Sequence, residues 1–311
     1  MITISKKFIS VFLVLLFVVS CGGGGGSSTP PEPSPTLTLS ASSSSVLLDN
    51  FIRLTWSSIN ATSCSASGAW SGSKAISGTE DITILTPGDN LFNISCSGAG
   101  GSASASAMVE GYRNTDGVSV DGYIRQAEIF IDTNDSYTAD SGEDTTTSDN
   151  DGKFTIKYSD GNLISLGGTD LDSGNALDNL LIVHKLTGHS DFKAVTPVTS
   201  VAAFMTDATL VNATLGIDAS LDITTVDPVA GKGDGGINDY LYEKGNQLTV
   251  LAYALQNITN NLNTTTETTQ DYFKAIAEEL DTEYAATEAR VNIETEAFIT
   301  KVLNNVVNIK S

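Results

Sequence analysis

Oxygen-bearing side chains recur at regular intervals between residues 132 and 143. Counted as a twelve-residue loop, this stretch places side-chain oxygens at loop positions one, three, five, nine and twelve, and a main-chain carbonyl at position seven. The groups belong to Asp132, Asn134, Ser136, Thr138 (its carbonyl), Asp140 and Glu143. Calcium takes six to eight hard oxygen ligands, and a carboxylate at the last position can bind through both oxygens. The spacing predicts a calcium site; the alternative is a solvated acidic turn without an ion.

This ligand order resembles that of an EF-hand calcium loop, with two departures. Tyr137 stands at position six, where such loops carry a glycine that permits a sharp turn. The flanking segment 127–131 alternates apolar and polar residues, which is typical of a strand and not of a helix. Both departures argue against a helix-loop-helix sensor but not against calcium. We expect a structural site with a dissociation constant on the order of 10⁻⁴ to 10⁻³ M.

Residues that could catalyse a reaction do not form a complete set. The segments 140–142 and 172–174 are both Asp-Ser-Gly, but neither has the flanking residues of an aspartic protease. Residues 71–74 match Ser-x-x-Lys without its companion motifs, and His184 and His189 have no accompanying hydrolase or zinc motif. We therefore predict a protein that is not an enzyme, with a hydrolase as the remote alternative.

Acidic residues dominate the charge of the chain. Asp and Glu number 37 against 16 Lys and Arg, which gives a net charge of −21. Binding to phosphate groups needs clustered cations, so nucleic acid and anionic lipid surfaces are disfavoured as partners. The same balance favours divalent cations wherever carboxylates converge.

The first residues have the pattern of an export signal. Lys6 and Lys7 precede the apolar run 8–19, which is too short to span a bilayer comfortably. The sequence Val-Val-Ser-Cys at 18–21 resembles a bacterial lipobox, which implies a signal peptide at 1–20 and acylation of Cys21 by fatty acids such as palmitate. The alternative is an ordinary secretory signal with an incidental cysteine.

Residues 21–36 are expected to form a tether. Five glycines at 22–26 and four prolines after them cannot bury enough apolar surface to offset the entropy of ordering. Gly22 is not the Asp that familiar lipoproteins carry for retention in the inner membrane. We therefore expect a lipid anchor in the bacterial outer membrane, with the protein exposed at the cell surface.

The remaining cysteines suggest a disulfide bond. The chain has three cysteines, and if Cys21 is acylated, Cys64 and Cys96 are left to pair in an oxidising, exported compartment. A metal site is the competing interpretation, but neither has another cysteine or a histidine nearby in the sequence.

The first folded unit is expected at 37–112. Apolar and polar residues alternate in five segments separated by turn residues, as in an antiparallel sandwich: 36–40, 52–56, 82–84, 91–96 and 103–109. Trp56 and the segments 60–64, 68–72 and 96–103 resemble a bacterial immunoglobulin-like domain. This resemblance implies a stalk without an active site, in which Trp56 and the two cysteines contribute stability.

The second unit, 113–166, contains the acidic loop. Its strand, loop and the following segment 145–156 resemble the small β-sandwich modules of bacterial surface adhesins, the collagen-adhesin B-type and carboxypeptidase-regulatory-like repeats. The resemblance implies a prealbumin-like sandwich, and in several of these families a similar loop is associated with structural calcium.

The third unit, 167–311, is expected to be an all-α domain. Thr196 is a predicted N-cap before Pro197. Apolar residues then recur at helical spacing in three sets. These are Ala252, Leu255, Ile258 and Leu262; Phe273, Ile276, Ala277 and Leu280; and Ile299, Val302, Leu303 and Val306. The segments 167–170, 196–200 and 222–228 resemble a helical module of large bacterial surface proteins.

The predicted fold is thus a multidomain chain of two all-β sandwiches, immunoglobulin-like and then prealbumin-like, followed by an all-α helical domain. The first functional hypothesis is a surface-exposed structural or adhesive lipoprotein with a protein or glycan ligand. The second is a periplasm-facing binding lipoprotein that helps to assemble envelope machinery through its helical domain.

Overall fold

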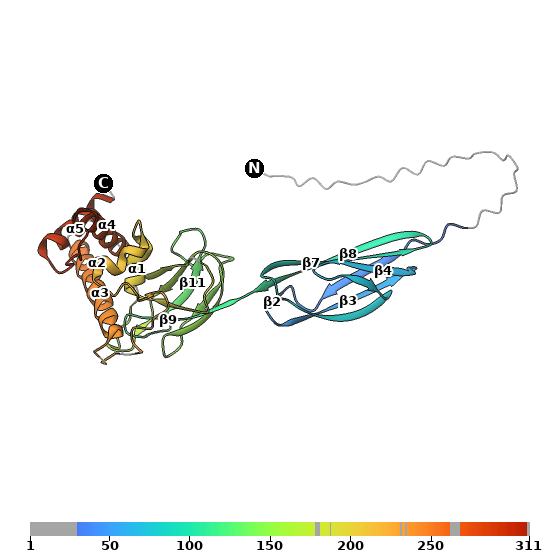
Figure 1. Cartoon of the computed structure of the whole chain (residues 1–311), viewed down its shortest axis with the longest axis horizontal. Helices are drawn as coiled ribbons and strands as arrows, with labels where there is room; N and C mark the ends of the chain where they lie inside the picture. The colour runs from blue at the N-terminus through green and yellow to red at the C-terminus, as the bar shows by residue number, and fades with distance from the viewer. Residues whose placement is uncertain are drawn as a thin grey trace, which may run out of the picture.

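The computed structural model describes residues 30–177, 181–186, 188–230, 232–233, 235–261 and 268–309. The predicted signal peptide at 1–20, the predicted acylation site Cys21 and the glycines at 22–26 lie outside these residues. The described chain is mostly β-sheet and ends in a helical region (Figure 1). Within it, no helix is both long and apolar enough to cross a lipid bilayer.

Eight strands form a sandwich in the N-terminal part. They are β1 (Thr36–Ala41), β2 (Ser45–Leu47), β3 (Phe51–Ile59), β4 (Ser63–Gly68), β5 (Gly72–Lys74), β6 (Ser77–Thr83), β7 (Gly88–Gly98) and β8 (Gly101–Tyr112). One sheet has the order β1-β3-β6 and the other β2-β8-β7-β4-β5. The structure confirms strands at the predicted segments, apart from the last residue of 82–84, and it adds β2, β4 and β5.

The core of this sandwich follows from the alternation along β3. Ile52, Leu54 and Trp56 are buried while their neighbours are exposed. Trp70 meets the Trp56 ring edge-on, with 5.4 Å between ring centroids. The Cys64–Cys96 disulfide is confirmed. It joins β4 and β7, which are neighbours in one sheet, so it is not the bond between sheets that antibody domains have.

Nine further strands follow, and Figure 1 shows the chain passing directly from β8 into them. They are β9 (Asn114–Ser119), β10 (Ile124–Arg125), β11 (Glu128–Asp132), β12 (Thr145–Thr147), β13 (Lys153–Lys157), β14 (Asn162–Leu166), β15 (Thr169–Asp170), β16 (Leu181–Lys185) and β17 (Phe192–Val195). They form sheets of order β12-β11-β14-β16, β13-β9-β17 and β10-β15.

The strands β15, β16 and β17 correct the expectation that residues 167–311 are all-α. β16 pairs antiparallel with β14, and β17 pairs parallel with β9. The sheets that begin with β9 are therefore completed by residues beyond 166. The physical reason is that β14 and β9 would otherwise each have an open edge, and a strand edge is stabilised when another strand pairs with it.

The helices begin after β17. They are α1 (Pro197–Phe204), the short 3₁₀ helix η1 (Ala208–Leu210), α2 (Val211–Leu215), α3 (Ile237–Asn261), α4 (Thr269–Thr287) and α5 (Glu296–Ile309). The predicted N-cap Thr196 is confirmed: its side chain accepts from the Thr199 N–H, and Pro197 is the first helical residue. The three predicted sets of apolar residues lie on α3, α4 and α5, except Leu262, which is outside the described residues.

A single apolar cluster joins the helices to the strands. It contains Ile129 and Ile131 of β11, Val198 of α1, Leu248 of α3 and Phe273 of α4. α1 lies between β16 and the other helices (Figure 1). The apolar core thus does not break at residue 166, because the helices bury their apolar faces against the sheet as well as against one another.

Buried hydrogen bonds fix α1 against β16. The Ser200 hydroxyl accepts from the Val183 N–H at 2.8 Å, and the Thr199 hydroxyl donates to the Val183 carbonyl at 3.0 Å. Ser200 is fully buried. The main-chain groups of Val183 on the helix side are thereby satisfied without another strand.

Candidate metal centre

The predicted calcium loop connects β11 to β12. Asp132, at loop position one, is the last residue of β11 and is only 1% exposed. Asn134, Ser136 and Asp140 lie in the exposed part of the loop, and Glu143 is half-buried just before β12. One predicted ligand is therefore held by a strand, and the others depend on the conformation of the loop.

Asp132 organises the first half of the loop. Its Oδ1 atom accepts from the main-chain N–H groups of Asn134 at 3.1 Å and Ser136 at 3.2 Å. Its Oδ2 atom accepts from the N–H of Tyr137 at 2.9 Å. These bonds fold the chain back over the end of β11.

Tyr137 takes the conformation that a glycine would take at loop position six. Its φ is +58°, in the left-handed region that residues other than glycine rarely adopt. Such a conformation costs about 1 to 3 kcal/mol and needs support from its surroundings. The Tyr137 ring supplies that support. Its centroid lies 6.0 Å from that of the Phe204 ring, and it packs against a cluster that includes Phe130. The missing glycine therefore does not prevent the turn.

Burial of the tyrosine ring also has an electrostatic consequence. It raises the pKa of the Tyr137 hydroxyl, and the nearby carboxylates of Asp135 and Asp132 raise that pKa further. The phenol stays neutral at physiological pH and adds no negative charge to the loop.

Several predicted ligands meet at Asp140. Its Oδ2 atom accepts from Asn134 Nδ2 and from the Ser136 hydroxyl, both at 2.9 Å. These two hydrogen bonds lower the pKa of the Asp140 carboxyl, so it is ionised. The Ser136 hydroxyl also lies 3.1 Å from the Thr138 carbonyl oxygen, the group predicted at position seven. Positions three, five, seven and nine are thus gathered in one place.

Glu143 closes the loop from its other end. Its Oε1 atom accepts from the N–H of Thr133 at 2.8 Å and from the Thr133 hydroxyl at 3.1 Å. Its Oε2 atom accepts from the N–H of Asp140 at 3.0 Å. The last predicted ligand therefore holds the start and the end of the loop together.

The donor set has the chemistry that calcium prefers. All six groups offer oxygen, and a carboxylate has about four lone-pair sites, of which Asp132 and Glu143 each use three in the bonds above. The carboxylates are not gathered as ligands of one ion: no group of three or more His, Cys, Asp or Glu in the described chain could hold a metal. Calcium would have to replace the hydrogen bonds that Asn134, Ser136 and Asp140 make with one another.

The residues considered for catalysis have other contacts. His184 is buried, and its Nδ1 atom bonds to the Ala194 carbonyl at 2.8 Å. Burial lowers the pKa of His184 to about 4, so the ring is neutral. His189 bonds to the Asn114 carbonyl through Nε2. Of the two Asp-Ser-Gly segments, Asp140 bonds within its own loop and Asp172 pairs with Lys232.

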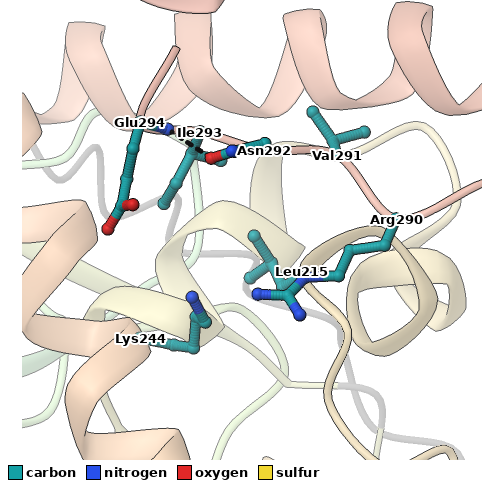
Figure 2. Close-up of a pocket in the computed structure, with 7 residues that line it drawn as sticks. All are labelled: Leu215, Lys244, Arg290, Val291, Asn292, Ile293 and Glu294. Atoms are coloured by element: carbon teal, nitrogen blue, oxygen red, sulfur yellow. Dashed lines mark hydrogen bonds between the residues drawn. The ribbon is translucent and has the colours of Figure 1, made fainter.

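The structure also contains a second candidate site, which none of the sequence motifs indicated. A cavity of about 290 Å³ is lined by Leu215, Lys244, Arg290, Val291, Asn292, Ile293 and Glu294. Figure 2 shows these residues. The two basic residues of the cavity lie on different elements far apart in the sequence. No local pattern in the sequence therefore indicates that Lys244 and Arg290 lie close together.

Comparisons with known proteins do not assign this chain to a family. A scan against protein-family models gave no match, and no curated protein matches the sequence.

Proposed function

We propose that this chain is a non-enzymatic lipoprotein of the bacterial cell envelope, anchored in the outer membrane through Cys21 and exposed at the cell surface, where it has a structural or adhesive role. A structural calcium ion bound by the 132–143 loop is part of the proposal. The observation that carries it is Tyr137 in the left-handed conformation at loop position six, held by the Asp132 carboxylate. Tyr137 thus reaches the conformation that a calcium loop needs at position six, and this supports the proposal.

The ion would link the ends of two neighbouring strands. Loop position one belongs to β11, and position twelve precedes β12, the neighbour of β11 in the sheet. Calcium held by Asp132, Asn134, Ser136, Asp140, Glu143 and the Thr138 carbonyl would join the ends of both strands. Since Tyr137 packs on Phe204 of α1, the same ion would also steady the contact between the loop and the helices. This role suits a protein that has to keep its shape outside the cell.

Calcium titration of the full chain tests the ion. We expect binding of about one ion with a dissociation constant on the order of 10⁻⁴ to 10⁻³ M, and a higher melting temperature when it is bound. Asp140→Asn should abolish both effects, because it removes the charge at the point where four predicted ligands meet. Calorimetry and thermal unfolding measure the two effects. Asp132→Ala is a poorer variant, since it removes the acceptor of the Asn134 and Tyr137 N–H groups and one of the two acceptors of the Ser136 N–H.

Asp135→Asn is the matched control for Asp140→Asn. It removes the same charge from the same loop at a position that is not a predicted ligand, and an asparagine can still accept the bond from Asn162. The calcium proposal is wrong if the wild type shows no heat and no change in melting at about 10 mM calcium, far above the expected dissociation constant. It is also wrong if both variants lose binding equally.

Surface exposure needs a test of its own, because the periplasm-facing alternative has some support. Val250 and Ile258 of α3 are exposed apolar residues, which a partner of the helical region could cover. We expect labelled palmitate to be incorporated into this protein in wild-type cells and not into the Cys21→Ala variant. Protease added to intact cells should then cleave the wild-type protein. Protection of the lipidated protein from protease would favour the periplasmic alternative.

A further inference from the structure

Lys244 is a buried cation that has no acidic partner among the described residues. It lies on α3 and is 7% exposed. Its ammonium donates to Gln247 Oε1 at 2.6 Å and lies 5.4 Å from the centre of the Tyr240 ring. Among the residues that the structure describes, no carboxylate forms an ion pair with it. Lysine is rarely buried without a counter-charge, and this chain has more than twice as many acidic as basic residues.

Arg290 reaches the same cavity from the segment between α4 and α5. Its side chain packs directly on Gly216, at the end of α2, where an added Cβ atom would lie 2.5 Å from Arg290 Cδ. The glycine thus leaves the room that the arginine occupies. In the described part of the chain, Arg290 also has no carboxylate partner at ion-pair distance.

The two cations line the same cavity. Figure 2 shows the Arg290 guanidinium extending toward Lys244, while the Lys244 ammonium points into the cavity and the Glu294 carboxylate lies farther from Arg290. Like charges in this arrangement repel, and an anion between them turns the repulsion into attraction. Glu294 lines the cavity as well, but among the described residues it forms no ion pair with either cation.

We propose that this cavity binds the oxyanion group, a carboxylate or a phosphate, of a small molecule. The guanidinium can hold such a group through two parallel hydrogen bonds, and the ammonium adds a point charge from the opposite side. Leu215, Val291 and Ile293 provide apolar walls for the rest of the ligand. A volume of about 290 Å³ limits the ligand to the size of a small metabolite.

Glu294 makes the site sensitive to the charge of the ligand. Its carboxylate lines the same cavity, so it opposes a second negative charge on the bound molecule. A singly charged carboxylate should therefore suffer less from Glu294 than a doubly charged phosphate does. This difference separates the two ligand chemistries in an experiment.

The test is a titration of the full chain with inorganic phosphate and, separately, with acetate, followed by calorimetry and by the NMR signal of the Arg290 side chain. We expect saturable binding at one site and a shift of that signal. Arg290→Gln should weaken binding by about tenfold or more, and Glu294→Gln should tighten it, more for phosphate than for acetate. A general loss of structure would not tighten binding, so the pair of variants separates ligation from misfolding.

Lys274→Gln is the control for overall charge, because Lys274 is exposed on α4 and does not line the cavity. It should bind both anions as the wild type does, and so should Asp140→Asn, which affects only the proposed calcium loop. The inference is overturned if neither anion binds at about 20 mM, a concentration well above the range of about 1 μM to 1 mM in which enzymes typically bind small metabolites. It is also overturned if Arg290→Gln binds as tightly as the wild type, or if Lys274→Gln weakens binding equally.

Discussion

Replacing both Cys64 and Cys96 with alanine is expected to lower the free energy of unfolding of the N-terminal sandwich by about 3 to 4 kcal/mol. The bond closes a loop between residues 32 apart in the sequence, which contains β5 and β6. In the chain-entropy account, a cross-link of this span removes conformational freedom from the unfolded chain. Both cysteines are also buried in the core beside the tryptophans, so their loss removes apolar contacts as well.

Tryptophan fluorescence during denaturation measures this effect selectively. The chain has two tryptophans, Trp56 and Trp70, and both are buried in this sandwich. The far-ultraviolet signal of the helices reports on the C-terminal part in the same experiment, and it should be unchanged. Reducing agent should destabilise the wild type by less than the double substitution does, since the reduced cysteines keep their apolar contacts, and should leave the variant itself unaffected. The prediction would be contradicted if the free energies of unfolding of the variant and the wild type differed by less than about 0.5 kcal/mol.

The strands of the first sandwich could be predicted where large side chains alternate. On β3, Ile52, Leu54 and Trp56 mark one buried face, and that period of two is visible in the sequence. β4 was not predicted, because the buried residues on it are Cys64 and Ala66, which are too small to stand out among serines. A strand whose role is to complete a sheet needs little hydrophobic signal of its own.

The boundary between the β and α parts was wrong for a different reason. β16 begins with the apolar run Leu181-Ile182-Val183, but a run this short followed by His184 and Lys185 does not distinguish a buried strand from part of a helix. It pairs with β14 in the sheet, and its Val183 also hydrogen-bonds to Ser200 and Thr199 of α1. Such a partnership between a strand and a later helix has no local pattern, so the sequence alone suggested a boundary where the core is continuous.

The candidate sites differ in the same way. The oxygen groups of the 132–143 loop are close in sequence, and their spacing was sufficient to name them. The conformation of Tyr137 was not predictable from the loop, because the packing that supports it involves Phe204 of α1. Lys244 and Arg290 come together only through the packing of α3 with the segment that follows α4, so the cavity between them had no signal in the sequence.

Asp121→Asn should make the protein more stable at neutral pH. Asp121 is half-buried, and burial raises the pKa of its carboxyl from 3.8 to about 6, opposed by a hydrogen bond with Thr249 and aided by the charge of Asp170. The folded protein therefore binds this proton more tightly than the unfolded chain does. Stability then falls as the pH rises from about 4 to about 6, and about 3 kcal/mol is lost at pH 7. Asparagine cannot ionise, so the variant should gain up to that amount at pH 7 and little near pH 4.

His184 acts in the opposite direction over much of the same range. Burial lowers the pKa of its ring from 6.5 to about 4, aided by Lys193 and opposed by the Ala194 carbonyl and Asp222. The unfolded chain then binds the proton more tightly, so stability falls by about 3 kcal/mol as the pH falls from about 6.5 to about 4. In the wild type the slopes due to Asp121 and His184 nearly cancel. In Asp121→Asn the effect of His184 should remain alone, so the free energy of unfolding should rise with pH between about 4 and 6.5.

Urea denaturation at pH values between about 4 and 7.5, followed through the far-ultraviolet helix signal with calcium removed, measures both slopes. The informative quantity is the difference in unfolding free energy between Asp121→Asn and the wild type at each pH, since other groups cancel in it. Asp191→Asn, which removes an exposed charge, should show a difference that does not change with pH. If the difference for Asp121→Asn is equally flat, then the Asp121 carboxyl titrates in the folded protein as it does in the unfolded chain, and its burial costs nothing. A difference that grows by about 3 kcal/mol toward neutral pH would show that the fold keeps a destabilising carboxylate where asparagine would serve stability better.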